Sequence, residues 1–153
     1  MKLLKAQADL LESAINEPRK GAMVAPYKDG IVFAIPDHAS MGYFIPKDKL
    51  KVVCKPLDRM PFQQAELDII EESNRLVETN IEQKLKTVKA TIRQFVFAHD
   101  MTGEGVWLNA KFLQNFEHYT LYQNPKKPKS LILVTEGEGT IAGIIMPYNL
   151  KKI

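Results

Sequence analysis

Histidine, cysteine and acidic side chains are the first candidates for catalysis or metal binding in this sequence. The three histidines, His38, His99 and His118, lie far apart, with no helical i,i+4 pair. Cys54 is the single cysteine, so an internal disulfide or a cysteine-rich zinc site cannot form within the chain. His38 and His99 each adjoin an aspartate, but adjacent side chains of a strand point to opposite faces. We therefore predict no metal site, no cofactor and no catalytic dyad, and we do not expect an enzyme.

Lysines are the second candidates, because a dense basic loop can hold phosphate groups. Lys126, Lys127 and Lys129 alternate with prolines between two strand-like segments. Alternatively, this loop is only a hairpin connection, and its lysines serve to keep it soluble. Glycines frame a glutamate at 103–105 and at 137–139, but the rest of a phosphate-binding fingerprint is missing. We predict hairpin turns at both places.

The composition is that of an ordinary globular domain. The 153 residues are 45% hydrophobic and 25% charged, and the length predicts one domain. A net charge of +3 permits an anionic partner, although a dedicated nucleic-acid domain is usually more basic. The longest apolar runs are far shorter than the roughly 20 residues of a membrane span. We therefore expect a cytoplasmic protein without a membrane partner.

The elements predicted for the first half are one helix and an antiparallel meander. Residues 2–17 carry apolar side chains at helical spacing, which predicts an amphipathic helix. The apolar stripe expected to enter the core consists of Leu3, Leu4, Leu10, Leu11, Ala14 and Ile15. Short apolar runs separated by turn residues predict strands within 22–27, at 31–35 and 41–45, with a short strand at 50–54.

A long acidic helix is predicted for the middle of the chain. Apolar residues at positions 67, 70, 77, 81 and 85 have spacings compatible with one helical stripe, and glutamates lie between them. We predict that residues 63–85 form the longest helix, connecting two halves of the chain. The sequence does not indicate what this helix does.

The second half again combines a helix with strands. Residues 88–97 alternate between apolar and polar, which predicts a strand, and Asn109 is a plausible N-cap for a helix over 110–119. Strands are expected at 119–122, 131–135 and 141–146. Helix followed by strands thus occurs twice, which predicts an α+β fold with two antiparallel sheets. The two helices should pack side by side through Leu10, Leu11, Phe112 and Phe116.

The second half resembles the closing half of a bacterial DNA sliding clamp domain, the processivity subunit of the replicative polymerase. The resemblance lies in Val106, Leu108, Asn109, Lys111, Phe112 and Leu113, and then in Ile145, Met146, Pro147 and Leu150. A weaker similarity places 37–39 where the family has Asp-Gly-His-Arg. The chain departs from the family at Ala39, at 148–149, in its extension over 151–153 and in the predicted acidic helix.

This resemblance implies a single clamp-like domain over 1–153, with pseudo-duplicated halves at about 1–55 and 88–150. Its two helices would face DNA, and the expected phosphate contacts are Lys2, Lys5 and Lys111, joined by Lys126, Lys127 and Lys129. The family's pocket for partner peptides would correspond to His38, Met146, Pro147 and Leu150. One such domain could encircle DNA only as a homo-oligomer.

Two functions remain open from the sequence. The first is a DNA replication or repair accessory factor for processivity or tethering, of the kind that a phage or mobile element encodes. Its partners would be double-stranded DNA and polymerase or repair-protein peptides. The second is a clamp-fold protein–protein adaptor that binds peptides without encircling DNA. A small enzyme or an unrelated α+β protein is the third class.

Overall fold

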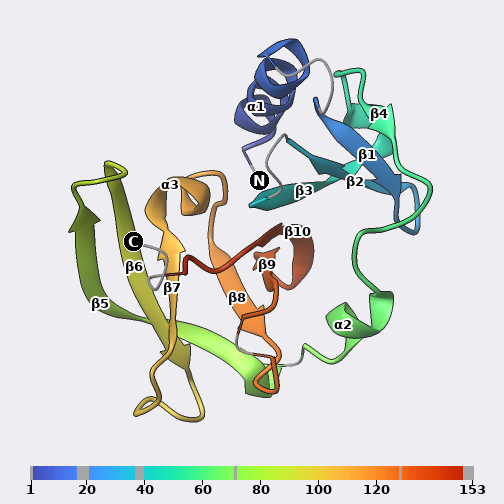
Figure 1. Cartoon of the computed structure of the whole chain (residues 1–153). Coiled ribbons are helices and arrows are strands. Elements are labelled where there is room, and N and C mark those ends of the chain that lie inside the picture. Colours follow the sequence, from blue (N-terminus) through green and yellow to red (C-terminus); the bar gives the residue numbers. More distant parts are fainter. Residues whose placement is uncertain (1, 17–20, 37–39, 71, 128, 150–153) are drawn as a thin grey trace.

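One strongly curved sheet organises the chain (Figure 1). The computed structural model describes residues 2–16, 21–36, 40–70, 72–127 and 129–149, without the side chains of Gln64 and Glu72. Within these residues, ten strands follow the order β4-β1-β2-β3-β10-β9-β8-β5-β6-β7. The elements are α1 (Leu3–Asn16), β1 (Met23–Pro26), β2 (Ile31–Ile35), β3 (Met41–Pro46), η1 (Lys47–Lys49), β4 (Lys55–Pro56), α2 (Gln64–Asp68), η2 (Glu72–Asn74), β5 (Arg75–Leu85), β6 (Ala90–Phe97), β7 (Val106–Asn109), α3 (Ala110–Leu113), β8 (Tyr119–Gln123), β9 (Ile132–Glu136) and β10 (Thr140–Ile145).

The predicted α+β class is confirmed, but the expected division into two sheets is wrong for the part of the chain that is described. The meanders β1–β2–β3 and β8–β9–β10 belong to one sheet because β3 and β10 pair antiparallel, with Tyr43 opposite Gly143. The short β4 alone pairs parallel, with β1. None of the helices in the described ranges is long and apolar enough to cross a membrane.

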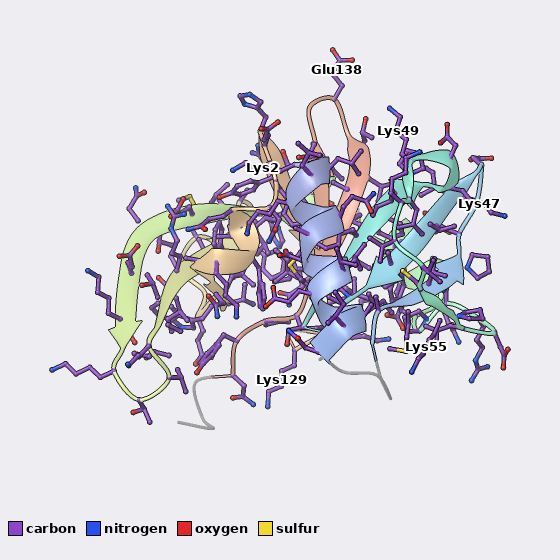
Figure 2. The ribbon with its side chains drawn as sticks, turned by 90° about the horizontal axis from the view of Figure 1, so that it is seen from above. Lys2, Lys47, Lys49, Lys55, Lys129 and Glu138 are labelled. Atoms are coloured by element: carbon purple, nitrogen blue, oxygen red, sulfur yellow. The ribbon has the colours of Figure 1, made fainter. Side chains whose placement is uncertain are left out.

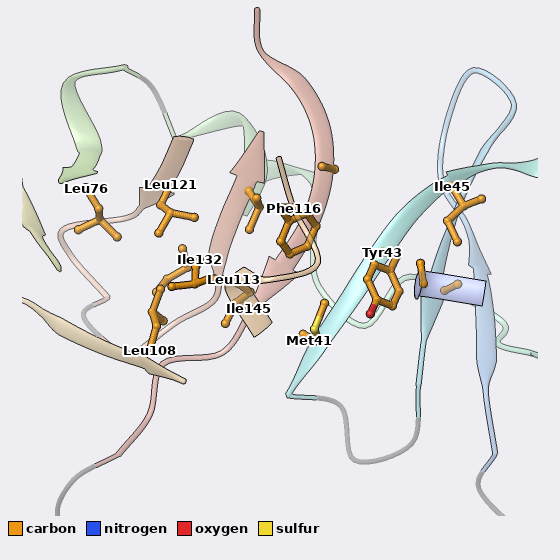
Figure 3. Packing of buried hydrophobic residues seen from close by; sticks show 14 of the residues in the cluster. Met41, Tyr43, Ile45, Leu76, Leu108, Leu113, Phe116, Leu121, Ile132 and Ile145 are labelled. Carbon is orange, nitrogen blue, oxygen red and sulfur yellow. The ribbon is translucent and has the colours of Figure 1, made fainter. Parts of the chain in front are cut away.

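Each face of the sheet has its own hydrophobic cluster. Consecutive side chains of a strand point to opposite faces, so Tyr43 enters one cluster and Phe44 the other. The first cluster lies under α1 and α3 and contains Leu10, Leu113 and Phe116 (Figure 3). Both helices therefore cover the same face of the sheet, as the sequence predicts.

The helix α1 buries only part of its expected apolar stripe. Ala6 and Leu10 are buried, whereas Leu4 is 88%, Leu11 50% and Ile15 66% exposed. The expected contact of Leu11 with the second helix in the core is therefore wrong. A straight helix presents one stripe to a sheet, and these three side chains point away from that stripe.

The predicted long acidic helix over 63–85 is wrong. Only Gln64–Asp68 is α-helical, a 3-10 turn follows, and Arg75–Leu85 forms β5, which pairs with β6. β-Branched Val77, Thr79 and Ile81 alternate along this segment, which suits a strand. The connection between the two halves is therefore a short helix and a long hairpin strand.

Two smaller predictions also need correction. The helix that begins after Asn109 ends at Leu113 instead of continuing to residue 119, although Asn109 does cap it, since its side chain accepts from the Lys111 N–H at 3.1 Å. Residues 50–54 form no strand, and the short β4 comes directly after them. The strands predicted at 31–35, 41–45, 119–122, 131–135 and 141–146 are present within a residue or two of those limits.

Candidate functional site

An open apolar groove lies on the face of the sheet opposite α1, where β3 and β10 pair. We call it the β3–β10 groove, and its volume is about 310 Å³. β2, β3, β10 and the segments beside α2 and β9 supply its walls. The side chains that line it include Phe33, Ile35, Phe62, Leu131, Ile144 and Met146. Glu66 is the single charged residue among the described lining residues.

Packed aromatic rings give the groove a rigid floor. The ring centroids of Phe33 and Phe62 lie 5.1 Å apart in an edge-to-face arrangement, and the ring centroid of Phe44 lies 5.0 Å from that of Phe33. Such contacts stabilise aromatic pairs beyond their buried area. The segment before α2, which carries Phe62, is thereby fixed against the sheet.

A glycine in β3 creates the space for this floor. A Cβ atom on Gly42 would overlap the ring of Phe33, so the ring can lie across the strand only at a residue without a side chain. Gly42 also pairs with Ile144 of β10. The groove therefore depends on the β3–β10 pairing and on Gly42 within it.

Met146 is the predicted partner-binding residue that the structure places in the groove. Its side chain is 40% exposed, and its backbone N–H donates to the Ser40 carbonyl at 2.8 Å, which holds the end of β10 beside β3. Pro147 is half-buried and does not line the groove. His38 and Leu150 lie outside the described residues.

A second, polar depression lies between α1 and α3 on the other face. Its volume is about 420 Å³, and Lys5 from α1 and Lys111 from α3 both line it. Asp9 and Glu12 share it, so two carboxylates stand beside the two ammonium groups. The sequence predicted these lysines as phosphate contacts but did not predict the carboxylates beside them.

A buried hydroxyl forms the floor of this depression. Tyr43 donates to Asp9 Oδ2 at 2.8 Å, and Asn115 Oδ1 lies 3.1 Å from the same hydroxyl oxygen. Burial raises the pKa of Tyr43 far above its ordinary value, and the Asp9 carboxylate raises it further. The neutral hydroxyl links α1, β3 and the turn after α3.

The six lysines predicted to bind DNA do not form one surface. Lys2 and Lys129 lie apart in Figure 2, although both are exposed. The Lys2 N–H donates to the Asn115 carbonyl, next to the α1–α3 depression, whereas Lys126, Lys127 and Lys129 belong to the β8–β9 connection. Lys5 and Lys111 of the expected helix lining share one depression, and the loop with Lys126, Lys127 and Lys129 is a second basic place.

We did not predict from the sequence the Phe33–Phe62 contact or a third group of exposed lysines. Phe33 and Phe62 were not expected to meet, because they belong to segments that only the tertiary structure brings together. Lys47, Lys49 and Lys55 are exposed on one side of the molecule (Figure 2), and their close spacing in the sequence was a usable signal for a basic surface.

The groove and the depression are both built from segments of the two halves, and neither arrangement could be recognised from one short motif. The chain matches no protein-family model, no curated protein and no solved structure.

Proposed function

We propose that this chain is a protein–protein adaptor that binds an apolar peptide segment in the β3–β10 groove. The observation that carries the proposal is an open, largely apolar groove with Met146 exposed at its rim. Contiguous apolar surface that is exposed in a folded protein often marks a binding site. A flexible methionine side chain can adapt to different side chains of a partner.

The chemistry of the groove favours a particular class of peptide. The aromatic floor offers contact to leucine-like or aromatic anchors, which gain most from leaving water. Glu66 at the wall favours a lysine or arginine beside the anchor. The expected ligand is therefore a short segment with apolar anchors and an adjacent positive charge.

The same proposal includes a clamp-like, pseudo-duplicated arrangement. It is supported by the order of elements, because a helix followed by three antiparallel strands occurs as α1-β1-β2-β3 and again as α3-β8-β9-β10. The last strands of the two units pair with each other. The groove lies at the end of β10, where the resemblance to sliding clamps implies a peptide pocket.

DNA tethering is a second candidate. It is favoured by Lys5 and Lys111, which come from two different helices and line one depression. Asp9 and Glu12 in the same depression argue against it, since carboxylates repel phosphates. The adaptor function therefore ranks first.

Selection from a phage library of random nine-residue peptides tests the adaptor function. We expect the selected peptides to carry apolar anchors and to bind Met146→Glu at least about tenfold more weakly, because the substitution places a charge in an apolar groove. Met101→Glu is the matched control, since Met101 is 66% exposed in a turn far along the chain. Peptides that bind both variants as tightly as the unmodified protein would contradict the groove assignment.

Fluorescence anisotropy with a labelled DNA duplex tests the second candidate. If the depression holds phosphates, Lys5→Gln with Lys111→Gln should reduce the salt slope of binding by about two units, one for each lost contact. Replacing Lys126, Lys127 and Lys129 by glutamine tests whether the β8–β9 connection also contacts phosphates. The variant with Lys47→Gln and Lys49→Gln is the control for the loss of two positive charges elsewhere. A protein that does not bind the duplex at low salt excludes DNA tethering.

A further inference from the structure

The helix α1 carries a second apolar stripe that faces away from the sheet. It consists of Leu4, Ala8, Leu11 and Ile15, all of them exposed. We call these four residues the α1 stripe. Figures 1 and 2 both place α1 at the outside of the molecule, and none of the other helices and strands of the described residues lies over it. An amphipathic surface helix ordinarily turns charged or polar residues to this side.

The spacing of the α1 stripe is that of a coiled-coil seam. Its members are four, three and four residues apart, which is the alternation of d and a positions in a heptad pattern. The apolar side chains of such a seam are buried when they pack against a second helix that has the same spacing. Two copies of α1 satisfy this requirement.

An antiparallel pair of α1 helices is self-complementary in size. In this orientation, Leu4 of one copy opposes Ile15 of the other, and Ala8 opposes Leu11. Large residues therefore meet at both ends, and each alanine faces a leucine in the middle, which lets the helices approach closely. The interface is isologous, as a two-fold symmetric dimer requires.

The charges beside the stripe select the same orientation. Lys5 and Glu12 both flank it on one edge, each directly following a leucine of the stripe. Reversing the direction of the second helix brings Lys5 of one copy beside Glu12 of the other, and the contact occurs twice. In a parallel pair, Lys5 of one copy lies at the same height as Lys5 of the other, and Glu12 at the same height as Glu12. The opposite charges therefore do not meet.

We propose that the α1 stripe is a homodimer interface, in which two copies of this chain pair their α1 helices antiparallel, with Lys5–Glu12 contacts between them. The interface lies on the α1 side of the sheet, whereas the β3–β10 groove opens on the other face. Both grooves of the dimer remain free. The assembled molecule is bivalent, which raises the avidity for a partner with two peptide segments.

Sedimentation velocity over a range of protein concentrations tests the dimer. We expect a species of twice the 17.4 kDa chain mass that dissociates on dilution. Leu11→Lys should abolish it while circular dichroism remains unchanged, because half of the Leu11 side chain is already exposed. Lys5→Glu or Glu12→Lys alone should weaken the dimer about tenfold, because each places like charges at both contacts.

A mixture of the Lys5→Glu and Glu12→Lys proteins gives the decisive result. The mixed dimer has opposite charges at both contacts, so association should return to the level of the unmodified protein. Lys47→Glu, at an exposed lysine outside α1, should leave association unchanged. A monomer at every concentration, a dimer that survives Leu11→Lys, or a mixture that associates no better than either variant would overturn the proposal. None of these outcomes affects the test of peptide binding in the groove.

Discussion

At the scale of single residues, the buried Tyr43 hydroxyl makes stability depend on alkaline pH. Its pKa is raised in the folded protein, so above the ordinary tyrosine value of about 10 the unfolded chain loses this proton first. Below that pH, titration of Tyr43 should therefore not change the free energy of unfolding. Above it, the Tyr43 contribution should fall by up to about 1.4 kcal/mol per pH unit.

Urea unfolding of the Tyr43→Phe variant measures this contribution. The variant should be less stable by about 1 kcal/mol near neutral pH, because Asp9 and Asn115 lose the hydroxyl. Its decline above pH about 10 should be shallower than that of the unmodified protein, since only the other groups still titrate. Parallel declines for the two proteins would show that the hydroxyl is not buried as described.

At the scale of elements, Gly143 determines how closely β3 and β10 approach. A Cβ atom at this position would lie 2.6 Å from the Gly42 carbonyl oxygen and 2.6 Å from Phe116 Cζ. Because one of these neighbours is backbone of the paired strand, Gly143→Ala should cost about 1 to 3 kcal/mol of unfolding free energy. Gly103→Ala is the matched control, with its nearest neighbour at 3.6 Å, and should change stability by less than about 0.5 kcal/mol. Equal stability of the two variants would argue against a close β3–β10 pair.

Strand elements were largely predictable, and the middle of the chain was not, for a simple geometric reason. Val77, Ile81 and Leu85 are spaced four apart, and this spacing places side chains on one face of a helix and equally on one face of a strand. This segment is a strand because it pairs with β6, and the spacing of its own residues does not predict that pairing. In α1, two leucines in succession cannot both face the sheet, so Leu3 packs against the core and Leu4 does not.

The sequence predicted two parts of the candidate sites, the methionine at the end of the last strand and the lysines of the two helices. Pro147 follows the last strand, so an exposed Met146 could be anticipated from the sequence. Phe33 and Phe62 come from β2 and from the segment before α2, and their contact depends on the curvature of the whole sheet. The lysines of the two helices were also predicted, but the carboxylates that share their depression were overlooked.

At the scale of the whole molecule, the two faces of one sheet carry different surface features. The face under α1 carries the polar depression and the α1 stripe, and the opposite face carries the β3–β10 groove. A dimer through α1 therefore leaves peptide binding unobstructed.

Methyl NMR of the methionines locates peptide binding most directly. The chain has six methionines, of which Met146 lines the groove, Met41 has its sulfur 3.4 Å from Asn115 Nδ2 on the opposite face, and Met101 lies in the turn between β6 and β7. With carbon-13-labelled methionine methyl groups, a peptide selected for binding should shift the Met146 signal most strongly and leave the Met101 signal unchanged. Binding that leaves the Met146 signal in place while shifting methionines outside the groove would contradict peptide binding in the β3–β10 groove.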